Sequence, residues 1–205
     1  MKKQLLNVMY LIPPAIFVFL CACQTTSSNL SMDPNNYNVN LHLIDYFPKL
    51  DAAKYQQFKG KKICMPNIKN NAGNTTNFSY YSKDLKVQYQ LSHASNTPIQ
   101  FIPSYFWYAY QKAFQYAGIE ASADCSSANL PELWIIFQSF NDEELMLKIT
   151  ILKNRETVYE KDLTVAIVPV SFRDPIGLQQ RAYEMIDLTI TTILDDPGLQ
   201  AILLK

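Results

Sequence analysis

Three strand-like runs follow one another between residues 133 and 168, and they constrain the fold more than any other feature of the chain. Residues 133–140, LWIIFQSF, are almost wholly apolar, whereas 144–152 alternates apolar and polar side chains. The Asn141-Asp142 and Lys153-Asn154 pairs predict turns around the middle run, and 157–168 completes a meander. We expect one face of the middle strand to lie in the core because it carries only aliphatic side chains, Leu145, Leu147, Ile149 and Ile151.

A helix is predicted on each side of this meander. The first begins at Pro103-Ser104, runs for about 14 residues and ends at Gly118, a residue suited to the C′ position. Its apolar stripe is formed by Phe106, Tyr110, Ala113, Phe114 and Ala117. The second begins at Asp174-Pro175 and runs to about Leu194. Its apolar face is formed by Ala182, Tyr183, Ile186, Ile190, Ile193 and Leu194. The pattern predicts an α+β fold, a mostly antiparallel sheet with two main helices packed on one face.

Four aromatic side chains of the first helix lie off its apolar stripe, namely Tyr105, Trp107, Tyr108 and Tyr116. A helix of this length buries only one stripe against a sheet. Either loops cover the surplus rings, or the rings form a contact surface. Because large aromatic residues are enriched where proteins bind one another, we take these four as candidate contacts for a partner or a lipid.

Shorter patterns occupy the N-terminal half. Residues 41–47 alternate in polarity, and 48–58 predicts a short helix. Residues 61–65, KKICM, and 85–91, LKVQYQL, predict strands. The polar segment 65–77 predicts a surface loop, with a ligand-binding loop as the alternative.

The N-terminus has a basic start, Lys2-Lys3, and an uncharged apolar run from Leu11 to Ala22. The run is short for a membrane span, which needs about 20 apolar residues, and suits the apolar region of a secretory signal. It ends in Leu20-Cys21-Ala22-Cys23, which resembles the box of bacterial lipoprotein signals. The alternatives are an ordinary signal peptide or an N-terminal anchor helix. A metal clip is disfavoured because neither of the two histidines lies at ligand spacing from the cysteine pair.

This resemblance implies a lipoprotein signal peptide at 1–22. Residues 24–40, QTTSSNLSMDPNNYNVN, have no apolar periodicity and predict a flexible tether, so we assign 23–40 to the tether and 41–205 to a periplasmic α+β domain. Cys23 would carry the acyl chains, palmitate among them, that hold the protein on a membrane without a spanning helix. Gln24 is not the aspartate by which such lipoproteins are retained in the inner membrane. The expected location is therefore the outer membrane, on its periplasmic side, with surface exposure left open.

The charge balance argues against nucleic acid as a partner. The whole chain has 18 basic and 18 acidic residues, and loss of Lys2 and Lys3 leaves a mature chain with a slight acidic excess. Proteins that bind nucleic acid or anionic membrane surfaces usually carry a basic excess.

Two further cysteines, Cys64 and Cys125, lie in the 61–65 strand and in the polar loop after the first helix. In an oxidising compartment two otherwise unassigned thiols predict a disulfide. Closing a loop of about 60 residues would contribute about 4 kcal/mol in the chain-entropy model. Two buried free thiols are the alternative.

The sequence offers little for catalysis. It has no GxSxG elbow, no Ser-x-x-Lys, no HExxH and no glycine-rich phosphate loop. His42 and His93 lie in a predicted strand and a polar loop, and the acidic pairs at 143–144 and 195–196 lie at turns and helix ends. We therefore expect no enzymatic activity, no cofactor and no metal site.

From residue 85 to 194 the chain resembles the auxiliary lipoproteins of Mce-type ABC lipid transporters. The likeness rests on an aromatic helix ending in Ala-Gly, the LPELWIIFQSF strand, two further strands and the helix QRAYEMIDLTITTIL. Outer-membrane assembly lipoproteins of the lipopolysaccharide-export type are similar. The resemblance implies a non-enzymatic accessory in envelope lipid or envelope-component transport, which binds an envelope protein or a lipid. The alternative is a structural lipoprotein that anchors a secretion system or another trans-envelope complex.

Overall fold

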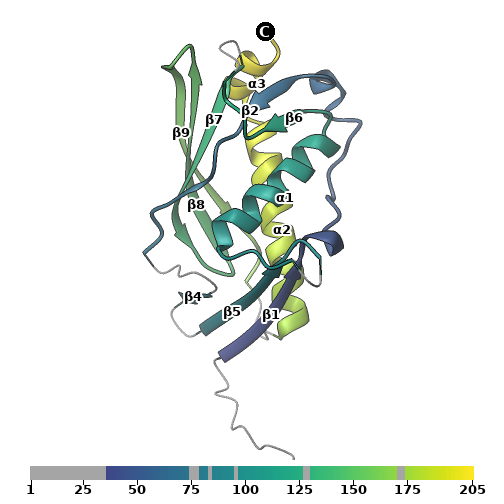
Figure 1. The fold of residues 1–205 in the computed structure, drawn as a ribbon, viewed down its shortest axis with the longest axis vertical. Helices are drawn as coiled ribbons and strands as arrows, with labels where there is room; N and C mark the ends of the chain where they lie inside the picture. The colour runs from purple at the N-terminus through teal and green to yellow at the C-terminus, as the bar shows by residue number, and fades with distance from the viewer. Residues whose placement is uncertain (1–35, 74–78, 83–84, 95–96, 127–129, 170–173) are drawn as a thin grey trace, which may run out of the picture. The chain divides into compact units, whose positions relative to one another are not determined.

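The computed structural model describes residues 36–73, 79–82, 85–94, 97–126, 130–169 and 174–205 (Figure 1). The larger sheet has the strand order β6-β2-β7-β8-β9, and β3 pairs with β7. Its strands are β2 (Lys62–Cys64), β3 (Lys69–Asn70), β6 (Glu120–Ser122), β7 (Glu132–Phe140), β8 (Glu144–Lys153) and β9 (Glu156–Ala166). The smaller sheet has the order β1-β5-β4, with β1 (Asn36–His42), β4 (Ser79–Ser82) and β5 (Leu85–Ser92). The helices are α1 (Ile102–Tyr116), α2 (Pro175–Leu194) and α3 (Pro197–Leu203).

The predicted meander is confirmed. Strands β7, β8 and β9 pair antiparallel in sequence order, and Leu147 of β8 lies opposite Phe137 on one side and Leu163 on the other. These three side chains are buried, as the alternation predicts. In the β8–β9 turn Asn154 and Arg155 both have positive φ, 54° and 69°, the conformation of a tight two-residue hairpin turn.

The α+β class is also confirmed, and antiparallel pairing predominates through β7, β8 and β9, but the sheets are mixed because they contain parallel pairs as well. Strand β2 pairs parallel with β6 and β7, β3 pairs parallel with β7, and β1 pairs parallel with β5. The parallel β2–β6 pair arises because the chain runs through α1 before it returns beside β2 in the same direction. Very short strands such as KIC carry no pattern that reveals their direction.

Both long helices pack on the apolar face of the meander (Figure 1). Phe106 of α1 makes edge-to-face contacts with Phe137 and Phe140 of β7, with ring centroids 5.5 Å and 5.4 Å apart. Helix α2 contacts α1, β1 and β9. The predicted apolar stripe of α1 is buried throughout. In α2 the Asp174 side chain caps the helix by accepting a hydrogen bond from the Gly177 N–H at 2.7 Å, as its position before Pro175 predicts.

Three local predictions are corrected by the structure. Helix α1 starts at Ile102, with Phe101 at the N-cap and no capping side chain, so Ser104 lies inside the helix. Residues 48–58 form turns and a 3-10 turn at Gln56–Phe58 instead of an α-helix. The cause is tertiary: Tyr46 and Tyr55 bond to α2 and hold this segment along it. Residues 36–40, assigned to the tether, belong to β1 because Val39 and Leu41 are buried in the core.

The structure joins Cys64 and Cys125 in a disulfide, with their Cα atoms 5.2 Å apart. This separation lies in the ordinary range for disulfides. Cys64 ends β2, where its N–H donates to the Pro131 carbonyl at 2.9 Å and the next residue, Met65, donates to the Ser122 carbonyl at 2.7 Å. The bond therefore crosslinks the chain at the point where β2, β6 and the start of β7 meet.

Loss of this disulfide should destabilise the fold. We expect Cys64→Ala to lower the free energy of unfolding by about 2–4 kcal/mol, since the unfolded chain regains the freedom of a large loop. Urea denaturation of the oxidised protein measures the change, and dithiothreitol should lower the stability of the parent protein but not of the variant. Peptide mapping without reductant should recover the crosslinked pair, and ready alkylation of both thiols in the native protein would contradict the assignment.

Candidate functional site

The contact residues predicted on α1 are mostly core residues, which corrects that hypothesis. Tyr105 is fully buried and Trp107 is 8% exposed. The Trp107 indole N–H donates to the Met65 carbonyl at 2.9 Å, so the chain after β2 covers the ring. Tyr108 is half-buried between His93 and Trp107, and only Tyr116 is largely exposed. The second face of α1 is therefore covered by other segments of the protein, among them the residues after β2. This is the alternative in which loops cover the surplus rings.

A groove lies instead between the chain after β1 and helix α2. It is a hollow of about 570 Å³. One wall is formed by Asp45, Phe47 and Lys49. The other follows successive turns of α2 and is formed by Gln180, Tyr183, Glu184, Asp187, Leu188 and Thr191. The opposite face of α2, with Ile186 and Ile190, is buried in the core, so the groove is lined by the face that the core leaves free.

The two walls are joined by a buried hydrogen bond. The Tyr46 hydroxyl donates to Asp187 Oδ1 at 2.7 Å, and the Tyr46 ring packs on Tyr183 with centroids 5.5 Å apart. Burial raises the pKa of Asp187, and the hydrogen bonds from the Tyr46 hydroxyl and the Lys49 backbone, together with the Lys49 charge, only partly oppose this. Burial together with the Asp187 charge also raises the pKa of Tyr46, so the phenol stays protonated and donates.

Phe47 is the most exposed aromatic side chain of the groove, at 72%, yet it is held in place. Lys112 of α1 lies with its Nζ 4.9 Å from the centre of the Phe47 ring, a cation–π contact. The same ammonium group donates to the carbonyls of Leu43, at 3.1 Å, and Tyr46. Phe47 also borders a second hollow, of about 420 Å³, which it shares with Pro48, Lys112, Gln115 and Tyr116. The ring therefore stands between two depressions of the surface.

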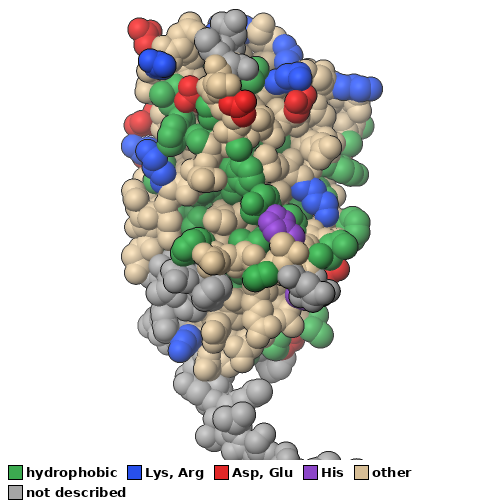
Figure 2. All heavy atoms as spheres, viewed as in Figure 1, with side chains coloured by type: hydrophobic (Ala, Val, Ile, Leu, Met, Phe, Trp, Pro, Cys, Tyr) green, Lys and Arg blue, Asp and Glu red, His purple; other side chains and the backbone are tan. Residues whose placement is uncertain are grey.

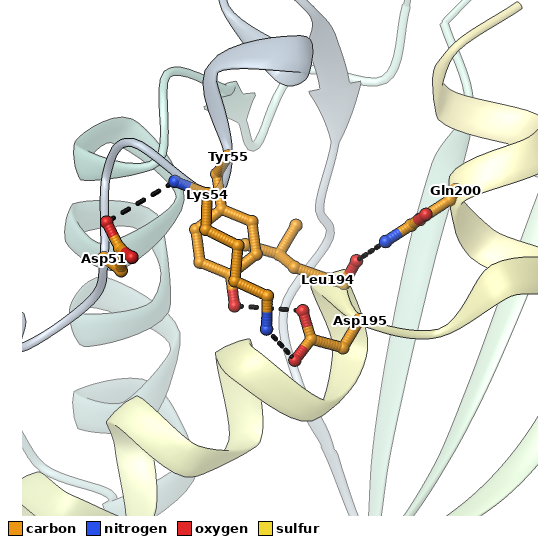
Figure 3. A network of polar contacts seen from close by, with 6 residues as sticks. All are labelled: Asp51, Lys54, Tyr55, Leu194, Asp195 and Gln200. Atoms are coloured by element: carbon orange, nitrogen blue, oxygen red, sulfur yellow. Dashed lines mark hydrogen bonds and ion pairs between the residues drawn. The ribbon is translucent and has the colours of Figure 1, made fainter.

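A polar network joins the end of α2 to Lys54 and Tyr55 (Figure 3). Asp195, at the end of α2, accepts from the Tyr55 hydroxyl at 3.1 Å and from Lys54 Nζ at 2.5 Å. The Lys54 pair is exposed and adds little stability, whereas the Tyr55 ring is buried. Segment 43–55 is thus tied to α2 by a tyrosine at each end.

The neighbouring Asp196 is not the surface residue that its place at a helix end suggests. Its side chain is 3% exposed and accepts from Tyr159, at 2.6 Å, and from Lys161. It also caps α3 by accepting from the Leu199 N–H at 2.9 Å. Burial raises the pKa of Asp196, but these donors, Lys161 first, outweigh it and bring the pKa to about 2.

The remaining candidate catalytic side chains among the described residues have structural roles. His42 Nδ1 lies 2.5 Å from the Ser92 hydroxyl, but Ser92 is only 6% exposed, and the pair links the ends of β1 and β5. Within the described ranges, no group of three His, Cys, Asp or Glu side chains converges as metal ligands would. No helix among the described residues is long and apolar enough to cross a membrane. Cys23 lies outside the described residues.

Figure 2 shows the face that carries α1, with hydrophobic side chains through its middle and charged side chains gathered toward the end that carries the C-terminus. The groove residues were missed by sequence reasoning because they come from segments about 140 residues apart. Two signals could have pointed to them. Asp187 interrupts the apolar run of α2, and Phe47 stands before a proline in a segment that forms no regular helix.

Comparison with solved structures finds chains that are similar to this one at low sequence identity. Protein XCC0632 from Xanthomonas campestris, described by the family-model DUF330, is 13% identical, with a TM-score of 0.49 over 78% of this chain and 91% of that chain. A second crystal structure, of an uncharacterized protein, is 9% identical, with a TM-score of 0.44 over 82% of this chain and 97% of that one. No family model and no curated protein matches the sequence.

The two buried carboxylates should respond to pH in opposite directions. Asp187 has a raised pKa in the fold, so its contribution to stability is present below its unfolded pKa of about 4 and is lost as the pH rises. We therefore expect Asp187→Asn to gain stability relative to the parent protein between pH 4 and pH 7. Asp196 has a lowered pKa, and its contribution is present above about pH 4 and is lost as the pH falls toward 2.

Asp196→Asn is the matched comparison because it makes the same chemical change at a carboxylate with cationic and phenolic donors. It should cost about 1–3 kcal/mol near pH 7, and the cost should shrink on acidification. Urea denaturation at a series of pH values measures the change in the free energy of unfolding for each of the two variants. Parallel pH profiles for the two variants would show that the assigned environments are wrong.

Proposed function

We propose that this chain is a lipid-anchored accessory protein of the bacterial envelope, a non-enzymatic adaptor in the transport of lipids or other envelope components. The observation that carries the proposal is Phe47, a large aromatic side chain that is 72% exposed and yet held between two hollows by Lys112. Exposed aromatics that border depressions are typical of protein interfaces.

The contacts around this residue support binding rather than incidental exposure. Lys112 holds the Leu43 and Tyr46 carbonyls, and Tyr46 is bonded to Asp187, so the backbone on the N-terminal side of Phe47 is held by two elements. Because this backbone is already fixed in the fold, a partner that covers Phe47 need not order the segment that carries it. Phe47 is therefore suited to be the central contact of a docking surface.

The anchor is proposed from the sequence. The Leu20-Cys21-Ala22-Cys23 box resembles a lipoprotein signal, and acyl chains at Cys23 would place the domain at the outer membrane, where a partner in the envelope could be met. In the alternative function, the same anchor and surface would hold a secretion system or another trans-envelope complex. The identity of the protein that contacts Phe47 would distinguish the transport adaptor from the anchor of a trans-envelope complex.

Acylation of Cys23 is directly testable. Mass spectrometry of the membrane fraction should find a mature N-terminus at Cys23 that carries acyl chains, and Cys23→Ser should move the protein out of that fraction. Cys21→Ser is the matched control, since serine is tolerated at this position of the box and should leave the protein in the membrane. An unmodified N-terminus at another residue would refute the lipoprotein assignment.

Phe47→Ser should remove function without unfolding the protein. Exposed substitutions usually change stability by less than about 0.5 kcal/mol, so the melting temperature should stay nearly constant. In a strain that lacks the gene, the variant should fail to restore resistance to detergent, whereas Val158→Ser, on exposed β9, should restore it. A photo-crosslinker at Phe47 should capture a component of an envelope lipid transporter. Capture of a secretion component would favour the alternative, and full complementation by Phe47→Ser would remove the proposed contact.

A further inference from the structure

The groove beside α2 has a charge pattern that the adaptor proposal does not yet use. Four charged side chains line it, the carboxylates of Asp45, Glu184 and Asp187 and the single ammonium group of Lys49. Asp45, Glu184 and Lys49 are exposed, whereas Asp187 is 8% exposed. The groove therefore carries an excess of two negative charges around a buried carboxylate.

Three basic side chains of α1, α2 and the segment after β1 are engaged outside the groove. Lys112 donates to two carbonyls and lies over Phe47, and Lys54 is paired with Asp195. Arg181 donates from Nε to the Asp142 carbonyl at 3.1 Å and from Nη1 to the Val168 carbonyl at 2.7 Å. These three cations are held by other acceptors and do not line the groove. Asp187 accepts a hydrogen bond from Tyr46 and lies within reach of the Lys49 charge. Burial still raises its pKa, so a further cation in the groove would favour the ionised carboxylate.

Apolar surface lies beside these charges. Phe47 stands on one wall, and Tyr183 and Leu188 stand on the other, along the same stretch of α2 as Glu184 and Asp187. From Gln180 to Thr191 this wall follows about three helical turns, a length of about 16 Å. Such a wall can contact a short peptide segment, with apolar and charged contacts alternating along it.

We propose that this groove binds a basic, partly apolar segment of the partner protein, with a Lys or Arg of that segment at Glu184 and Asp187 and an apolar side chain on Phe47. This inference rests on the adaptor function and specifies the chemistry of its partner. The charge complementarity selects a basic segment, and the length of the groove selects a segment over a single small ion. Charge complementarity of this kind confers specificity because an acidic competitor would be repelled by Asp45, Glu184 and Asp187.

The test uses the intact protein and two synthetic probes. The first is an acetylated hexapeptide amide of alternating leucine and lysine, and the second has glutamine in place of every lysine. We expect the lysine peptide to bind at least tenfold more tightly at low ionic strength, as measured by fluorescence anisotropy, and its affinity to fall as salt is added. Equal binding of the two peptides would overturn the proposal.

Variants locate the binding. Glu184→Gln, at an exposed position, should weaken the lysine peptide at least threefold, and Asp187→Asn should weaken it further. Glu156→Gln, at the exposed start of β9, makes the same change of charge outside the groove and should leave the affinity unchanged. Equal losses in Glu184→Gln and Glu156→Gln would show nonspecific attraction and overturn the site. If Asp187→Asn fails to fold, the comparison of Glu184→Gln with Glu156→Gln still shows whether the lysine peptide binds in the groove.

A lipid headgroup with an amine is the competing occupant. Vesicles of phosphatidylethanolamine should leave the bound lysine peptide in place, and displacement by these vesicles would overturn the proposal in favour of a lipid site. The peptide experiment tests the chemistry of the partner, whereas complementation by Phe47→Ser tests the adaptor function. If the peptides fail to discriminate while Phe47→Ser still fails to complement, the partner's chemistry is wrong and the adaptor function stands.

Discussion

The contact of Phe106 with Phe137 and Phe140 is the interaction on which the rest of the structure depends. All three rings are buried, and the two edge-to-face contacts join α1 to β7 at the centre of the core. Such aromatic pairs each add about 0.5–1.5 kcal/mol to the free energy gained from burial. Because α1 is held on the sheet in this way, Lys112 on another side of the helix becomes a rigid point to which the chain after β1 can attach.

The second constraint is the attachment of residues 43–55 along α2. The rings of Tyr46 and Tyr55 are buried, and their hydroxyls donate to Asp187 and Asp195. Each tyrosine therefore contributes both apolar packing and a hydrogen bond to the attachment of this segment to α2. Between these two attachments the chain lies beside the helix, with Leu50 packed into the core. The groove is the space that remains between the segment and the free face of α2, and Phe47 projects beside it because its neighbour Tyr46 already occupies the buried position.

These features make binding the function that the surface supports best. The polar groups near the groove are engaged in holding its walls, as the Tyr46–Asp187 and Tyr55–Asp195 bonds illustrate. What faces outward is the exposed ring of Phe47 and a set of carboxylates in excess over lysine. An acidic, partly apolar groove on a domain proposed to be tethered by acyl chains would favour association with a basic segment that is held near the same membrane, since the shared surface raises its effective concentration.

The sequence by itself determined the α+β class, the β7–β9 meander, the two long helices and the buried stripe of α1, because hydrophobic periodicity and capping residues act over neighbouring positions. It could not determine the parallel pairings, since KIC and KN are too short to carry a direction. It misplaced Trp107 because what covers one face of a helix is a distant segment, here the chain at Met65. It also predicted a helix at 48–58, where bonds from Tyr46 and Tyr55 to α2 outweigh a modest local preference. Tertiary structure alone decided the groove, because its walls come from opposite ends of the domain and meet only when the chain is folded.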